Sequence, residues 1–195
     1  MDRANNYSML LLAGGKSLRM GTNKAELLYK GKTFVENLIE KAEYLGIKHI
    51  YLSGYQEDRQ DVNVIWDIYP EVGPLGGLHA GMKNIETACF LVLPVDVPQI
   101  PESFLEDLIS YHEKKLLGSD EENIPLILEH QGFLEPLIGI YPKDMADFVE
   151  ERIKNQYLSV FRMLKEWGCV CYKSNIPEEY IANVNTQEDY AKLLK

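Results

Sequence analysis

The chain has 195 residues, of which 46% are hydrophobic, and a formal net charge of −10. This length and composition suit one hydrophobic core, so we expect a single domain over residues 1–195. An acidic surface repels phosphate backbones and anionic lipids, which excludes nucleic acids and membrane surfaces as expected partners.

Two further features of the composition predict a cytoplasmic location. Residues 1–8 lack the apolar core of a signal peptide, and no apolar run reaches the length of a membrane span. Cys89, Cys169 and Cys171 are an odd number of cysteines in apolar surroundings, without C-x-x-C spacing. We interpret them as buried free thiols in a reducing compartment.

The first predicted strand, residues 8–12, is almost entirely apolar, as expected of a buried parallel strand. It is followed by two glycines and three cations: Gly14, Gly15, Lys16, Arg19 and Lys24. Because glycines let the backbone approach a phosphate and the cations supply charge, the segment predicts a polyanion-binding loop. The alternative is an ordinary turn with solvated cations. The segment matches neither the G-x-G-x-x-G fingerprint nor the Walker spacing, which indicates a third type of nucleotide loop.

Next in the chain, residues 24–29 are expected to be extended, with a turn at Lys30-Gly31. Thr33 and Glu36 have the spacing of a capping box, which begins a helix that Gly46 ends. The other elements expected in this half are strands at 49–53, 62–66 and 89–94, a turn at 73–77 with a helix behind it, and a helix at 101–115.

The second half of the chain is less regular. The gap between two predicted strands, 124–128 and 136–141, is too short for a crossover helix, so antiparallel pairing is expected there. The remaining expected elements are helices at 143–154 and 159–167, a strand at 169–172 and a last helix capped by Thr186. The predicted fold class is α/β: a three-layer Rossmann-like fold with a mostly parallel sheet and an antiparallel portion in the second half.

Two aspartates directly follow predicted strands, at the edge where ligands of such sheets bind. Asp96 comes just after the apolar strand 89–94. A carboxylate there suits Mg²⁺ that is shared with nucleotide phosphates, and the alternative role is to cap the following helix. Asp67 follows strand 62–66, and it either accepts hydrogen bonds from a ribose or base or merely begins a loop.

The four histidines lie far apart in the sequence, and the spacing of a zinc site is not found. His79 lies close behind the 73–77 turn. It could contact a ligand there, but we expect a surface or helix-capping histidine.

Together these features resemble the molybdenum cofactor guanylyltransferases (MobA), within the wider group of MobA-like nucleotidyltransferases. The resemblance spans nearly the whole chain. Its motifs are Leu12-Ala13-Gly14-Gly15-Lys16-Ser17-x-Arg19-Met20-Gly21-x-x-Lys24, Gly73-Pro74-Leu75-Gly76-Gly77, Pro94-Val95-Asp96-Val97-Pro98, Glu135-Pro136-Leu137 ahead of Tyr141, and Asn183-Val184-Asn185-Thr186.

The resemblance implies an enzyme that uses GTP and Mg²⁺ to transfer GMP to the phosphate of molybdopterin, with release of pyrophosphate. We expect a nucleotide-binding half at about residues 8–115 and an acceptor-binding half at about 116–195. The nucleotide-binding residues implied are Leu12, Ala13, Gly14, Gly15, Lys24, Ser53, Asp67 and Asp96. Asp96 is implied to be the metal ligand. We expect Arg19, Lys24 and Asp96 to be catalytic, because the two cations and a metal ion on Asp96 would stabilise charge that develops on the phosphates. Asn183 and Asn185 are implied to face the pterin.

This sequence departs from the family at two places. Ser53 stands where the family often has asparagine, and residues 132–134 lack the arginine that many relatives place before the Glu135-Pro136-Leu137 motif. Two other functions stay open. One is another MobA-like transferase, for cytidylyl or sugar-phosphate transfer, and the other is a non-catalytic nucleotide-binding or cofactor-binding module. Proteins of cofactor biosynthesis or acceptor enzymes are further possible partners.

Overall fold

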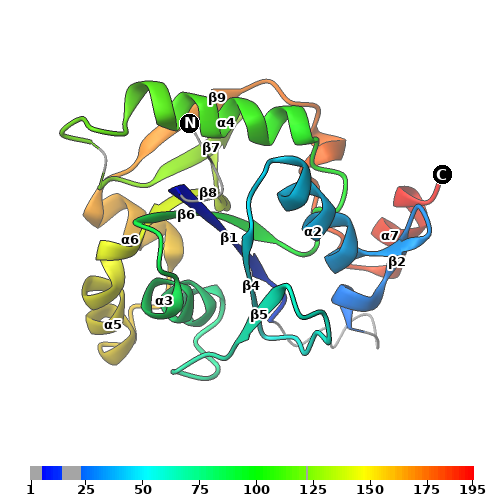
Figure 1. The fold of residues 1–195 in the computed structure, drawn as a ribbon, viewed down its shortest axis with the longest axis horizontal. Helices are drawn as coiled ribbons and strands as arrows, with labels where there is room; N and C mark the ends of the chain where they lie inside the picture. Colours follow the sequence, from blue (N-terminus) through cyan, green and yellow to red (C-terminus); the bar gives the residue numbers. More distant parts are fainter. Residues whose placement is uncertain (1–5, 15–22, 122) are drawn as a thin grey trace.

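The computed structural model describes residues 6–14, 23–121 and 123–195. Its centre is a seven-stranded sheet in the order β5-β4-β1-β6-β8-β7-β9 (Figure 1). The strands are β1 (Tyr7–Leu12), β4 (His49–Ser53), β5 (Val62–Ile65), β6 (Cys89–Pro94), β7 (Leu126–His130), β8 (Phe133–Pro142) and β9 (Val170–Ser174).

The direction of the strands follows the prediction from the sequence. Strands β5, β4, β1 and β6 pair in parallel, and β8 runs antiparallel to both β6 and β7. Strand β9 pairs in parallel with β7. The mostly parallel sheet with an antiparallel portion in the second half is therefore confirmed. Its parallel strands end at one edge, where their carboxyl ends create a place for a ligand.

Helices cover both faces of the sheet, so the three layers are confirmed (Figure 1). Helices α2 (Phe34–Tyr44) and α4 (Glu102–Lys115) contribute to the hydrophobic core on one face. Helices α3 (Pro74–Asn84), α5 (Ala146–Lys154) and α6 (Val160–Trp167) contribute to the core on the other. Strands β1 and β6 are buried along their whole length between these layers, which explains why both are almost continuously apolar.

Capping boxes begin two helices, and both were expected from the sequence. At α2, the Glu36 backbone N–H donates to Thr33 Oγ1 over 3.1 Å, and the Thr33 N–H donates to Glu36 Oε2 over 2.6 Å. At α7 (Gln187–Leu193), Thr186 and Asp189 form the same pair of bonds. Each box satisfies backbone donors that the first helical turn would leave without partners.

The last helix returns to the N-terminal half of the chain. Helix α7 lies beside the short strand β2 (Leu28–Tyr29), which forms a hairpin with β3 (Lys32–Thr33) (Figure 1). The Tyr190 hydroxyl donates to the backbone oxygen of Leu28 over 2.8 Å. This contact brings the segment before α7 next to residues that are far away in the sequence.

Some predicted segments differ from the structure. Residues 24–29 begin with the 3₁₀-helix η1 (Lys24–Glu26) and become extended only at β2. The antiparallel strands extend closer to their turn than predicted, since β7 reaches His130 and β8 begins at Phe133. The expected turn at 73–77 is wrong beyond its first residue, because α3 already begins at Pro74. Proline suits the first turn of a helix, since its missing N–H would have no helical partner.

Other elements complete the chain: 3₁₀-helix η2 (Lys143–Met145) leads into α5, and η3 (Glu178–Tyr180) follows β9. Cys89 is buried as expected, but Cys169 and Cys171 are only half-buried, so the interpretation of all three cysteines as buried is wrong. Within the described residues, the helices are too short or too polar to cross a bilayer.

Candidate functional site

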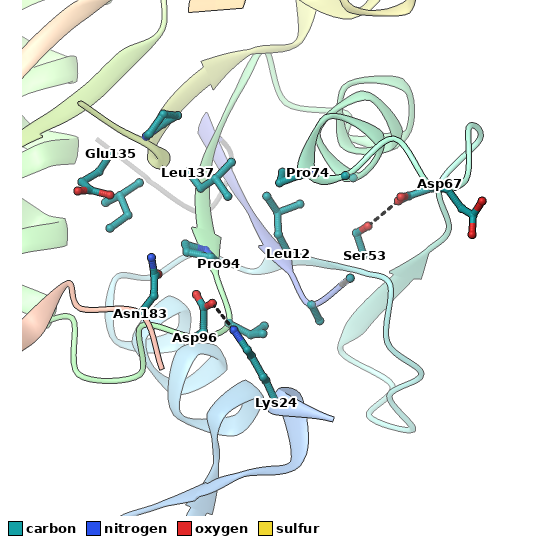
Figure 2. Close-up of a pocket in the computed structure, with 18 residues that line it drawn as sticks. Leu12, Lys24, Ser53, Asp67, Pro74, Pro94, Asp96, Glu135, Leu137 and Asn183 are labelled. Carbon is teal, nitrogen blue, oxygen red and sulfur yellow. Dashed lines mark hydrogen bonds and ion pairs between the residues drawn. The ribbon is translucent and has the colours of Figure 1, made fainter. Parts of the chain in front are cut away.

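A pocket of about 1010 Å³ opens at the carboxyl ends of β1, β4 and β6 (Figure 2). Segments from the whole length of the chain meet in it. The described residues that line it are Leu12, Ala13, Gly14, Lys24, Ser53, Asp67, Glu71, Gly73, Pro74, Gly77, Pro94, Val95, Asp96, Glu135, Pro136, Leu137, Ile138 and Asn183. This volume suits a ligand of small-molecule size.

The end of β1 forms one wall of the pocket with its backbone. The Ala13 N–H donates to the backbone oxygen of Ser53 over 2.8 Å, which extends the pairing of β1 and β4 past the end of both strands. Gly14 then passes very close to Gly54, where an added Cβ would lie 2.4 Å from the Gly14 Cα. Gly54 also has φ +82°, which side-chain-bearing residues rarely adopt. Glycine at this position therefore allows the two backbones to approach.

Lys24, Asp96 and Asn185 form a hydrogen-bonded cluster beyond the end of β6. The Lys24 Nζ lies 2.8 Å from Asp96 Oδ2 and 2.6 Å from Asn185 Oδ1. The Asp96 backbone oxygen also accepts from the Val184 N–H over 2.9 Å, so the last loop is held against the end of β6. The Lys24 and Asp96 side chains are only 18% and 17% exposed, which weakens the screening of their charges by water.

The second carboxylate oxygen of Asp96 fits a metal ligand. Its Oδ1 is buried and has no hydrogen-bond partner in the described part of the chain. A hard divalent cation such as Mg²⁺ binds one or two carboxylates and the phosphates of its substrate, so a single aspartate is sufficient. The alternative that Asp96 caps the following helix is wrong, because α4 begins after Pro101 without a side-chain cap.

Ser53 and Asp67 lie on one side of the pocket, next to the first turn of α3 (Figure 2). The Ser53 hydroxyl donates to Asp67 Oδ1 over 3.0 Å. Burial raises the pKa of the Asp67 carboxyl above its ordinary value, and the Ser53 hydrogen bond and the His79 charge oppose this rise. A Cβ on Gly76 would lie 2.5 Å from Asp67 Oδ2. Glycine inside α3 therefore makes room for this carboxylate.

Glu135 and Asn183 lie on the opposite side of Pro94 from the Ser53–Asp67 pair (Figure 2). Burial raises the pKa of the Glu135 carboxyl above its ordinary value, and the charge of His130 opposes this rise. The sequence pointed to Glu135 only as part of a motif and assigned it no role. The sequence feature that could have singled it out is a charged residue next to Pro136 in an otherwise apolar strand. Burying a charge there is costly unless it has a partner.

The structure brings most of the sequence-predicted site residues together. Those that line the pocket are Leu12, Ala13, Gly14, Lys24, Ser53, Asp67, Asp96 and Asn183. Asn185 does not line the pocket, but its side-chain oxygen accepts a hydrogen bond from Lys24. Gly15 and Arg19 lie outside the described residues. The assigned roles of all these residues stay predictions.

The expectation for His79 is wrong. Its side chain is 1% exposed, within α3 and behind the pocket wall, so it is neither a surface histidine nor a cap. Both ring nitrogens are buried without a hydrogen-bond partner among the described residues, and Nε2 lies 3.8 Å from Glu150 Oε2. Burial lowers the pKa of this imidazole, and Glu150 partly offsets that effect.

The chain is similar to known nucleotidyltransferases over most of its length. The family model of the MobA-like NTP transferase domain matches residues 9–167. A probable molybdenum cofactor guanylyltransferase from Clostridium perfringens is 32% identical, with 96% of each chain covered. A molybdenum cofactor guanylyltransferase from Xanthomonas euvesicatoria is 27% identical, with 96% of this chain and 94% of the relative covered.

A solved structure has the same fold. Molybdopterin-guanine dinucleotide biosynthesis protein A from Archaeoglobus fulgidus superposes with a TM-score of 0.77 at 25% identity, covering 95% of this chain and 96% of the other. The resemblance and the nucleotidyltransferase fold predicted from the sequence are thus confirmed. By its fold and by the relatives that match along nearly its whole length, the chain belongs to the family of MobA-like NTP transferases and is a nucleotidyltransferase.

Proposed function

We propose that this protein transfers GMP from GTP to the phosphate of molybdopterin and releases pyrophosphate. The protein would act in the cytoplasm, with Mg²⁺, as one domain with a nucleotide-binding and an acceptor-binding half. The names of the relatives support this reaction. The observation that carries the proposal is the Lys24–Asp96 pair in the pocket lining, with one Asp96 carboxylate oxygen that has no hydrogen-bond partner among the described residues.

The reaction we propose is an in-line displacement at the α-phosphorus of GTP. The attacking group is a phosphate that is already ionised, so the protein needs no general base. The chain has to position two polyanions and neutralise the charge that develops between them. Lys24 would contact the phosphates from the pocket lining, and Arg19 is proposed on sequence grounds as a second cation.

Asp96 would hold the divalent ion through the Oδ1 atom that no described residue contacts. A bound Mg²⁺ would supply positive charge that offsets the negative charge of the phosphates. The backbone of Leu12, Ala13 and Gly14 would hold the nucleotide, and Ser53 and Asp67 would contact its guanosine portion. Asn183 and Asn185 would face the acceptor.

The decisive experiment measures pyrophosphate release in the presence of GTP, Mg²⁺ and molybdopterin, with CTP, ATP and UTP in parallel reactions. We expect release only when molybdopterin is present, and fastest with GTP. Faster release with CTP would assign the protein to cytidylyl transfer. Nucleotide binding without release in any mixture would instead indicate a non-catalytic binding module.

We expect Asp67→Asn to stabilise the ligand-free protein at neutral pH. Because burial raises the pKa of Asp67, the native protein binds more protons than the unfolded chain between the ordinary and the raised pKa. The stability contributed by Asp67 therefore falls as pH rises from its ordinary pKa through its raised pKa. Asparagine does not ionise, so the variant does not lose this stability. Thermal unfolding at acidic and neutral pH checks this, and a variant less stable than the native protein at neutral pH would contradict it.

The same substitution should weaken nucleotide binding. If Asp67 accepts hydrogen bonds from guanosine as a carboxylate, loss of the charge raises the Kd for GTP by roughly 10-fold to 100-fold. Titration with GTP measures this value. The control is Asp147→Asn, an exposed carboxylate that pairs with Lys83 away from the pocket, and it should leave the Kd for GTP unchanged.

Gly76→Ala tests the geometry around Asp67. The new Cβ would lie 2.5 Å from Asp67 Oδ2, so the carboxylate must turn away. We expect the Kd for GTP to rise about 10-fold. The matched control is Gly81→Ala on the same helix, whose Cβ would lie 2.5 Å from Leu10 Cδ2 in the core. The control should lose about 1–3 kcal/mol of stability while binding GTP normally. Equal effects of both variants on GTP binding would overturn the assignment.

A further inference from the structure

The pocket holds more carboxylates than phosphate binding requires. Four described lining residues are acidic, and Lys24 is the one lysine or arginine among the lining residues that the structure describes. The acidic residues are Asp67, Glu71, Asp96 and Glu135. Asp96 is accounted for by Lys24 and a metal ion. A carboxylate away from that centre repels phosphate, and it suits an uncharged part of a substrate that presents N–H or O–H donors.

Glu135 has no hydrogen bond or ion pair with any residue that the structure describes. It lies in β8 directly opposite Leu128 of β7, and His130 is opposite Phe133. Side chains two residues apart on a strand point to the same face, so Glu135 and His130 are diagonal neighbours on one face of the sheet. His130 is 8% exposed, and neither ring nitrogen has a partner among the described residues.

The position of Glu135 relates it to the acceptor and not to the nucleotide. Figure 2 shows Glu135 and Asn183 together on one side of Pro94, with Ser53 and Asp67 on the other side. In the same view, Lys24 and Asp96, the proposed phosphate-binding pair, lie below Pro94 (Figure 2). The pocket therefore has two separate polar ends, as a site that joins two heterocycles through a pyrophosphate would need.

We propose that Glu135 binds the acceptor by accepting two hydrogen bonds from adjacent N–H donors of its heterocycle. This inference rests on the proposed function. The 2-amino-4-oxo ring of a pterin presents a ring N–H beside an exocyclic amine, and a carboxylate matches this edge with both oxygens. A site built for such donors strongly rejects analogues that lack them, because its buried acceptors are then left unpaired. Glu135 thereby selects a pterin and sets its orientation in the pocket.

The first test is Glu135→Gln, which keeps the size of the side chain but replaces one acceptor by a donor. We expect the KM for molybdopterin to rise roughly 10-fold to 100-fold, while kcat and the KM for GTP change less than about twofold. The control is Glu129→Gln, whose carboxylate lies 3.7 Å from Lys173 and does not line the pocket. An unchanged KM for molybdopterin, or a rise in the KM for GTP, would overturn the proposal.

The second test does not depend on catalysis. Fluorescence titration of the native protein compares 6-hydroxymethylpterin with 6-hydroxymethyllumazine, in which an oxo group replaces the exocyclic amine. We expect the native protein to bind the pterin at least about 10-fold more tightly, and Glu135→Gln to lose this preference. Equal affinity of the native protein for both probes would refute the role of Glu135. Absence of pyrophosphate release from GTP and molybdopterin, with the pterin preference intact, would instead count against the proposed reaction alone.

Discussion

Replacement of Asp96 by alanine should lower the rate of GMP transfer by roughly 10³-fold or more, at saturating Mg²⁺. The substitution removes the carboxylate whose Oδ1 would hold the metal and whose Oδ2 binds Lys24 over 2.8 Å. The fold should persist, because the contact with Val184 uses the backbone oxygen of Asp96. Pyrophosphate release measures the rate, and thermal unfolding verifies the fold.

Two further variants make this result specific. Asp96→Asn keeps the size of the side chain and an oxygen that can accept from Lys24, so it should fold normally and still lose activity because the charge is gone. Asp61→Ala removes an exposed carboxylate that pairs with Arg59, and it should keep full activity. Full activity of Asp96→Ala would refute the assignment of Asp96 as the metal ligand.

Replacement of Lys24 by methionine should lower kcat by roughly 10²-fold to 10³-fold. Methionine fills similar space but cannot neutralise charge on the phosphates. The Lys24 ammonium also has a structural part, since it bonds Asn185 over 2.6 Å and Asp96 over 2.8 Å. Steady-state kinetics with both substrates should show the loss mainly in kcat. The reason is that Lys24 would stabilise the negative charge of the transition state more than that of the bound substrates.

Asn185→Ala separates the structural role of Lys24 from its role as a cation. It removes the bond between Lys24 and the last loop but keeps the charge of Lys24, and we expect a loss of only about 10-fold. Lys32→Ala, which removes an exposed lysine paired with Glu40, should have no effect. If Asn185→Ala lost as much activity as Lys24→Met, the main role of Lys24 would be to hold the last loop in position, and not to neutralise phosphate charge.

The sequence was most informative where a local pattern has a direct physical meaning. Alternation of apolar strands with helical segments predicted a mostly parallel sheet with an antiparallel portion, and the Thr33–Glu36 spacing predicted the start of α2. The position of Asp96 directly after an apolar strand predicted its place at the ligand edge of the sheet. These inferences hold because parallel strands align their carboxyl ends whatever the details of packing.

Predictions from the local sequence were wrong where tertiary packing overrides the tendency of a residue to form a turn. Gly76 and Gly77 were expected in a turn, but both lie inside α3. An added Cβ at Gly76 would meet Asp67, and one at Gly77 would lie 2.7 Å from Leu12 Cδ2. Glycine is required here because the helix lies so close to the pocket wall, and a sequence read residue by residue carries no measure of that distance.

The sequence by itself determined the α/β class and the family, and it predicted most of the site residues that the structure places in the pocket lining. Only the tertiary structure decided which of them act together. The Lys24–Asn185 bond joins residues 161 positions apart, and it depends on helix α7 packing beside β2. The pairing of β7 and β8 likewise placed Glu135 in the pocket, near His130 and away from Asp67, and only this position suggested a role for it. Periodicity and capping are local properties of the chain, whereas the electrostatics of a pocket depend on which distant segments the fold brings together.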